Sequence, residues 1–313
     1  MGTKRHVKRR KSMLSEQKRI VYVALIWVAV ALVSVFLALL LGNILGKRAE
    51  RIKRETESAF SYTYTANSVA PIRAPFLDVK SKSNKDIESK VNALANKTES
   101  VSVCLTDENG IPEYRSKVYE SVAGACGSFD INSAMAFIKD KNIYVSACFL
   151  FNSFYVEDET SRNAAIAVEA AIVAEAVSAG VNDVIICDLP VTDLGISYVA
   201  KLFSEIRKLS PSAVLGASID YDNAISASGA AAIKDYSAFA DFCAIDLSDK
   251  QSEGITAEDA ARSLIYLFEV YPLRLLMSTS GLAEFNVQAE TLKALGITNY
   301  QAYKYHESSG SVG

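Results

Sequence analysis

Eight short apolar runs, separated by segments with helical character, restrict the fold of this chain more than any other feature. Between successive runs lie stretches of good helix formers, and this alternation is typical of βα units with a parallel sheet. Eight is also the number of strands that closes a barrel. The runs are residues 74–79, 101–106, 143–151, 183–188, 213–220, 242–246, 273–278 and 300–305.

The intervening segments have recognisable helix ends. Asp130 and Thr256 precede helical stretches and are predicted N-caps, Thr256 in a pattern close to a capping box. Gly180 and Gly296 follow helical stretches, where a left-handed residue ends many helices. Residues 160–179 are nearly all good helix formers, which predicts a helix packed on the outside of the sheet.

The repeating region, residues 71–306, has about 236 residues, close to the roughly 250 that are typical of a (β/α)8 barrel. We therefore predict an α/β fold of the TIM-barrel type, with an open doubly wound sheet as the alternative. The last seven residues, 307–313, are too few for a final covering helix. Either residues 48–60 pack into that gap, or this flank of the barrel is exposed and available to a partner.

A run of 22 uncharged residues, 20–41, precedes the barrel region. At roughly 1.5 Å per residue it forms about 33 Å of helix, enough to cross a bilayer core of about 30 Å. The apolar region of a cleaved signal peptide is shorter, about 7 to 15 residues. The predicted organisation is a basic tail, a transmembrane helix, a juxtamembrane stalk, the barrel and a short tail, at residues 1–19, 20–42, 43–70, 71–308 and 309–313.

Charge predicts the orientation of this anchor. Eight Lys and Arg residues precede the apolar run and five follow it closely, so the positive-inside rule puts the amino terminus in the cytoplasm and the barrel outside. Residues 1–54 carry 13 basic and two acidic residues, a charge of +11, which leaves −14 of the total of −3 on the remainder. Basic runs beside a membrane span set topology or touch anionic lipid, so we expect no nucleic-acid partner.

Cysteine and histidine usage argues against a metal centre or cofactor. Four of the five cysteines lie in apolar runs and are expected to be small buried side chains. The chain has no CxxC motif, and its only histidines are His6 and His306, so we predict neither a zinc site nor a Cys–His nucleophile. Free thiols on an outside domain suggest a bacterial source.

Carboxylates end several of the predicted strands. Asp188, Asp220 and Asp246 are each the last residue of a strand, at the end where barrels place their sites. Period-two alternation puts Gly216 and Ser218 on the same face as Asp220, which would leave space around it inside the barrel. Structural hydrogen bonding is the competing interpretation for these three acids. For Asp193, Asp222 and Asp249 we favour capping or loop solvation.

Paired carboxylates without histidine or metal ligands suit glycoside hydrolysis, in which one acid protonates the leaving oxygen and another attacks the sugar or activates water. Asp188, Asp220 and Asp246 are the predicted catalytic residues. For the aromatic side chains among the predicted substrate-binding residues, packing in the core or in loops is the alternative role. The predicted substrate-binding residues are Asp78, Asp107, Phe151, Tyr221 and Tyr305, with Phe154 and Tyr155 as further sugar platforms.

Three segments resemble the glycosyl-hydrolase barrel domain family of bacteria, relatives of the α-amylase-like barrels. They contain Asp107 with Gly110 and Tyr114, the strand 142–145 (NIYV), and the strand end 188–190 (DLP). The resemblance spans most of residues 71–306 and implies a TIM barrel acting on carbohydrate polymer. By analogy with the α-amylase-like barrels, Asp188 would be the nucleophile and Asp220 the acid, while Asp246 would have to replace an acid that is absent from the seventh strand.

Departures from that family keep a second function open. Thr106 stands where the family has a basic residue, Cys148 where it has an arginine, and Leu189 where it has a longer segment before the proline. The chain is therefore either a membrane-anchored glycosidase or a degenerate barrel that binds carbohydrate or protein at the envelope. A phosphate-binding barrel, suggested by residues 278–281 (STSG), is disfavoured by the negative charge.

Overall fold

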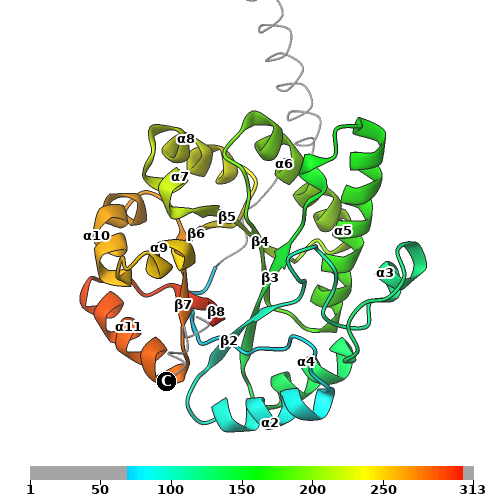
Figure 1. The fold of residues 1–313 in the computed structure, drawn as a ribbon, viewed down its shortest axis with the longest axis horizontal. Coiled ribbons are helices and arrows are strands. Elements are labelled where there is room, and N and C mark those ends of the chain that lie inside the picture. The colour runs from blue at the N-terminus through cyan, green and yellow to red at the C-terminus, as the bar shows by residue number, and fades with distance from the viewer. Residues whose placement is uncertain (1–68, 306–313) are drawn as a thin grey trace, which may run out of the picture. The chain divides into compact units, whose positions relative to one another are not determined.

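The computed structural model describes residues 69–305, in which eight parallel strands are surrounded by helices (Figure 1). The predicted runs are confirmed as strands, with boundaries that differ by at most two residues in all but the first. The strands are β1 Arg73–Ala74, β2 Ser100–Cys104, β3 Tyr144–Leu150, β4 Asp183–Cys187, β5 Val214–Asp220, β6 Phe242–Asp246, β7 Leu273–Thr279 and β8 Tyr300–Tyr305.

Helices follow every strand from β1 to β7 and form the outer ring. Asp130 and Thr256 cap their helices through hydrogen bonds from Ser133 N and Asp259 N, and Gly180 ends its helix with φ of 119°, all as predicted. The helices are α2 Asn84–Leu94, α3 Lys117–Val122, α4 Ile131–Asp140, α5 Glu159–Ala179, α6 Asp193–Leu209, α7 Tyr221–Ile225, α8 Ala227–Tyr236, α9 Ser248–Ser252, α10 Ala257–Phe268 and α11 Leu282–Ala294, with a 3₁₀ turn, η1, at Ser153–Tyr155.

The barrel closes between β1 and β2. β1 pairs with β8, and Phe76, two residues after the end of β1, forms a parallel bridge to Ser102 of β2. Leu77 N donates to Ser102 O at 2.8 Å, and Ser102 N donates to Pro75 O at 2.9 Å. The predicted barrel is therefore confirmed, and the open doubly wound sheet is wrong.

The strand register gives the stagger of this barrel. Register partners can be followed from strand to strand around the barrel, starting at Phe76 and ending at Arg73, which lies three residues earlier in the chain. To complete this circuit the path has to move forward by five residues in total along β5, β6 and β7. The total displacement is thus eight residues, which is the shear of a (β/α)8 barrel. With this shear, inward side chains at one height come from alternate strands.

Two apolar clusters fill the domain. The larger lies between the sheet and the helices, and the smaller fills the barrel interior. The interior cluster leaves no room at Gly216, because a Cβ there would lie 2.5 Å from the ring of Phe242. The expectation that Gly216 leaves space around Asp220 is therefore wrong: the glycine makes room for Phe242. The interior residues are Cys148, Ile185, Cys187, Phe242, Ala244, Leu276 and Tyr303.

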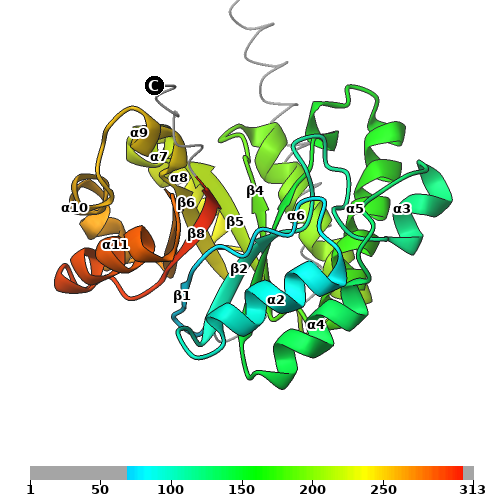
Figure 2. The same ribbon diagram turned by 60° about the horizontal axis from the view of Figure 1, so that its bottom comes forward.

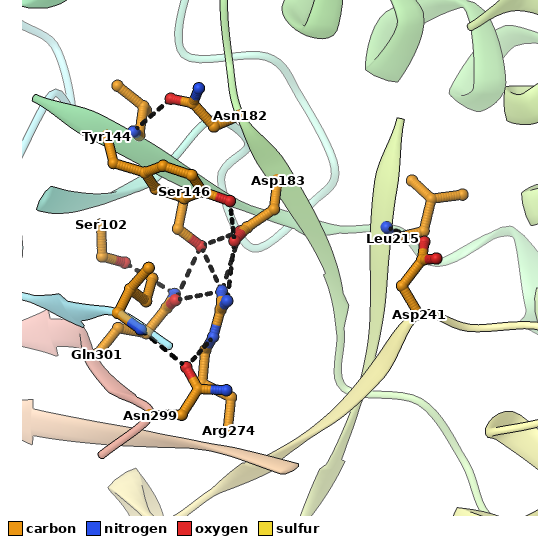
Figure 3. A network of polar contacts seen from close by, with 12 residues as sticks. Ser102, Tyr144, Ser146, Asn182, Asp183, Leu215, Asp241, Arg274, Asn299 and Gln301 are labelled. Atoms are coloured by element: carbon orange, nitrogen blue, oxygen red, sulfur yellow. Dashed lines mark hydrogen bonds and ion pairs between the residues drawn. The ribbon is translucent and has the colours of Figure 1, made fainter. Parts of the chain in front are cut away.

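A buried polar network fills the amino-terminal end of the barrel (Figure 3). Arg274 Nη2 lies 2.9 Å from Asp183 Oδ2, and both side chains are fully buried. Arg274 also donates to Ser146 Oγ at 3.0 Å and to Gln301 Oε1 at 3.1 Å, so the network joins β3, β4, β7 and β8. Its guanidinium carbon lies 4.2 Å from the ring centroid of Phe242. Residues at this end of a barrel contribute to stability, because the active sites of such barrels lie at the other end.

A second buried carboxylate anchors the connection between β3 and α5. Glu169 of α5 accepts hydrogen bonds from Ser153 Oγ at 2.6 Å and from Tyr198 Oη at 2.5 Å. Burial raises the pKa of the Glu169 carboxyl above its usual range, although these two hydrogen bonds act in the opposite direction. The network therefore fixes η1 against α5 and α6.

The flank at β1 and β8 has no covering helix among residues 69–305, and Figure 2 shows β1 between α11 and α2. The stalk segment 48–60, predicted as one possible cover, lies outside the described residues, as does the predicted membrane span 20–42. Within residues 69–305, no helix is long and apolar enough to span a membrane.

Replacing Asp183 with alanine tests the buried ion pair. Asp183→Ala leaves the Arg274 charge buried without its partner, and we expect the free energy of unfolding to fall by about 3–5 kcal/mol. Urea denaturation of the full-length chain in mild detergent, followed by circular dichroism, measures it. The control is Arg262→Ala, which breaks a pair with Glu258 whose side chains are 60% and 42% exposed and should leave stability almost unchanged. Equal effects of the two variants would contradict the assignment.

The raised pKa of Glu169 predicts a pH effect of definite sign. The folded state holds the Glu169 proton more tightly than the unfolded state, so the stability this gives below pH 4.5, the usual value, is lost as pH rises through the folded pKa. Glu169→Gln has no proton to lose. As pH rises above the usual value of 4.5, wild type should therefore lose stability relative to Glu169→Gln in urea denaturation. Parallel profiles for wild type and Glu169→Gln would refute the effect.

Candidate active site

The carboxyl-terminal mouth of the barrel is floored by one layer of inward side chains. The shear of eight puts residues of β2, β4, β6 and β8 at the same height there, and they are Cys104, Cys187, Asp246 and Tyr303. Tyr303 is 5% exposed and packs in the interior cluster. The mouth therefore ends on a floor that contains one carboxylate, one phenol and two thiols.

Asp188 follows β4 directly and lies at the rim of this floor. Its φ is +57°, in the left-handed region that non-glycine residues adopt at a cost. Its side chain is exposed, whereas the β4 residues before it are buried. A strained residue at the carboxyl end of a barrel strand favours a functional role, since such strain is often found at active sites.

Asp188 and Asp246 act on the same interior groups. Burial raises the pKa of Tyr303, and the charges of Cys187, Cys104, Asp188 and Asp246 add to this rise. The same two aspartates also help to raise the pKa of Cys104. Both carboxylates therefore lie close enough to Tyr303 and Cys104 to affect their pKa values, and both stand at the carboxyl-terminal end of the barrel.

Asp246 is also held by the chain that follows it. It ends β6, is half-buried, and accepts a hydrogen bond from Ser248 N at 2.7 Å. Ser248 is the first residue of α9. This hydrogen bond from the connection between β6 and α9 orients the Asp246 carboxylate.

Asp220 serves a structural purpose at the end of β5. It is the N-cap of α7: its Oδ1 accepts from Asn223 N at 2.8 Å, and its Oδ2 accepts from the Asn223 side-chain amide. It pairs in register with Asp246 on the neighbouring strand. Asp220 thus lies beside the candidate site, with both of its carboxylate oxygens engaged in capping.

The other acids predicted for substrate binding have local partners. Asp78 forms ion pairs with Lys90 at 2.9 Å and with Lys82 at 3.8 Å. Asp107 accepts from Asn109 N at 2.9 Å and from Ile111 N at 2.8 Å, which closes the turn after β2. Both carboxylates stabilise the connections that begin at their strands.

Most of the predicted sugar platforms pack in the core. Phe151, Phe154 and Tyr221 are each less than a tenth exposed and belong to the cluster between the sheet and the helices. Tyr155 is 72% exposed, with its ring centroid 4.1 Å from that of Phe154. Tyr305 is the last residue of β8, and its side chain lies outside the described part of the structure.

Sequence reasoning missed the floor of the mouth. The apolar runs place Tyr303, Cys104 and Cys187 on strands, but their inward direction follows only once the register of each strand is known. Ser218 was placed correctly on the inner face of β5; its hydroxyl is buried and has no hydrogen-bond partner in the described structure. Among residues 69–305, no group of three or more His, Cys, Asp or Glu side chains is arranged to hold a metal ion.

Comparisons with known proteins show similarity of fold. No family model matches the chain, and no curated protein sequence matches it. A solved structure described as a glycoside hydrolase has 10% identity and a TM-score of 0.52, covering 79% of this chain and 64% of its own. A GH18 chitinase from Pseudoalteromonas aurantia has 10% identity and a TM-score of 0.48, covering 74% and 93%.

A tryptophan synthase complex from Pyrococcus furiosus is also similar, with 11% identity, a TM-score of 0.46, and coverage of 75% of this chain and 87% of its own. At such identities a likeness extends to the fold alone, and barrels of this fold carry many unrelated activities. The chain is therefore similar in fold to the solved glycoside hydrolase, and the likeness extends no further than the fold.

Proposed function

We propose that this protein is a glycoside hydrolase-like barrel that acts on carbohydrate polymer through Asp188 and Asp246. The observation that carries the proposal is the left-handed backbone of Asp188, directly after β4 and within electrostatic reach of the same floor as Asp246. Glycoside hydrolysis needs two carboxyl groups about 5 to 9.5 Å apart across a bound sugar. Two acids on one barrel mouth are the chemical groups that this reaction uses.

In this scheme Asp188 takes the role of nucleophile, which the family resemblance gives to a fourth-strand aspartate. Asp246 protonates the leaving oxygen and then, as a carboxylate, activates the water that releases the sugar. The acid is thus assigned to β6, since the oxygens of Asp220 are engaged with Asn223. Ser218 offers a hydroxyl beneath these acids, and Tyr155 an exposed ring near the mouth connection of β3.

The membrane anchor sets where the substrate would be found. Residues 20–42 would hold the chain in a cell membrane with its amino terminus in the cytoplasm and its barrel outside. Cell-surface or wall polysaccharide would then be the nearest polymer. This location rests on the apolar run and its basic flanks.

A non-catalytic barrel is the second candidate. The observation that favours it is the use of Asp220 as a helix cap, because one of the three predicted catalytic acids is then engaged in structure. A barrel of this kind would keep its mouth for binding carbohydrate or a protein at the envelope. The flank at β1 and β8 would be a further surface for such a partner.

Neutralising each acid separates these functions. We expect the full-length chain in mild detergent to release reducing sugar from a bacterial or plant polysaccharide, and both Asp188→Asn and Asp246→Asn to lower the rate by at least about 100-fold, the lower range for loss of a catalytic acid or base. A reducing-sugar assay over a polysaccharide panel measures this.

The matched control is Asp220→Asn. Asparagine is also a good N-cap, so this variant keeps α7 and should keep most of the activity. Loss of activity in Asp220→Asn, with Asp246→Asn unaffected, would overturn the choice of acid. Polysaccharide binding without turnover by wild type and both Asn variants would instead support the non-catalytic barrel.

A further inference from the structure

Three cysteines meet inside the barrel directly under its mouth. Cys104 and Cys148 are register partners on β2 and β3, and Cys187 of β4 lies on the other side of Cys148. The thiols of Cys104 and Cys187 are close enough to Cys148 to affect its pKa. The other two cysteines lie elsewhere, Cys126 beside Ser116 and Cys243 against Ile233.

Register partners on neighbouring strands are about 4.7–4.9 Å apart in backbone terms, within the range of about 4.4–6.8 Å between Cα atoms that a disulfide spans. Cys104 and Cys148 are such partners, and their side chains point to the concave inside of the barrel, where curvature brings them closer together. Cys187 instead pairs in register with Leu150. Among the three, only Cys104 and Cys148 are register partners, so their strand spacing falls within the Cα range of a disulfide.

The contacts of the pair supply both a reactive sulfur and an accessible one. Cys148 is fully buried and its Sγ accepts a hydrogen bond from Gln301 Nε2 at 3.3 Å. The neighbouring thiols of Cys104 and Cys187 lower the pKa of Cys148 below its usual range. Cys104 is only half-buried, and its sulfur lies 3.4 Å from the carbonyl oxygen of Tyr303 at the floor of the mouth.

We propose that Cys104 and Cys148 are a redox-active pair that a small disulfide entering the mouth converts to a cross-strand disulfide. Cys104, whose sulfur lies at the floor of the mouth, loses its proton to the solvent and becomes a thiolate. That thiolate attacks one sulfur of the reagent, whose S–S bond breaks and releases one thiol.

Cys148 then attacks the Cys104 sulfur of the mixed disulfide and releases the second reagent thiol. The two cysteines lose two electrons and two protons, and the reagent disulfide gains both as two thiols. A neutral reagent is the simplest choice, because its approach does not depend on the charge of Asp188 or Asp246. Because Cys104 belongs to the floor layer, oxidation changes the surface that a ligand of the mouth would meet. The pair does not depend on the proposed hydrolysis.

Bis(2-hydroxyethyl) disulfide is a small neutral probe for this reaction. The native full-length chain in mild detergent is treated with it, quenched in acid, denatured and alkylated, and then digested without reduction for mass spectrometry. Of the five cysteines, we expect two to escape alkylation and one cross-linked peptide pair to contain Cys104 and Cys148. Dithiothreitol should restore both thiols.

Serine variants identify the pair independently. Cys104→Ser and Cys148→Ser should abolish the loss of two alkylated thiols, whereas Cys126→Ser and Cys243→Ser should retain it. The peptide map of wild type decides the question even where a variant fails to fold. Complete alkylation of all five cysteines, a stable reagent adduct on Cys104 without a cross-link, or a cross-link between Cys104 and Cys187 would each overturn the proposal.

Discussion

The rest of this domain depends on the closure of the sheet between β1 and β2. β1 is only two residues long, and the hydrogen bonds that join the following chain to Ser102 give β2 a partner on its second side. Closure fixes the shear, and the shear decides which inward side chains share a height. The ion pair of Arg274 and Asp183 at one end, and the floor beneath Asp188 at the other, are both consequences of that stagger.

The fold could be predicted largely from local patterns. Strand runs, helix caps at Asp130 and Thr256 and the left-handed Gly180 depend on residues close together in sequence, and the structure agrees with them. The first strand is shorter than expected because Pro75 cannot donate a backbone hydrogen bond. Of the four cysteines in the strands, which are predicted to be buried, Cys148, Cys187 and Cys243 are buried and Cys104 is half-buried.

The candidate site could be predicted only in part, because its chemistry depends on packing between distant segments. Asp188, Asp220 and Asp246 look alike in sequence, yet only the structure shows Asp220 capping α7 through Asn223. The buried ion pair did leave a signal. Arg274 and Asp183 are opposite charges inside two apolar strand runs, and a charge on a buried strand needs a partner. Which partner it finds depends on the register of the whole barrel.

The packing of Phe242 couples residues on three consecutive strands and limits which substitutions these positions can accept. Its ring occupies the space over Gly216 of β5 and lies against the Arg274 guanidinium of β7. A side chain larger than hydrogen at position 216 therefore requires a smaller residue at 242, which in turn uncovers the arginine. The residues at positions 216, 242 and 274 are therefore coupled by packing, and a change at one of them alters the space or the cover available to the others.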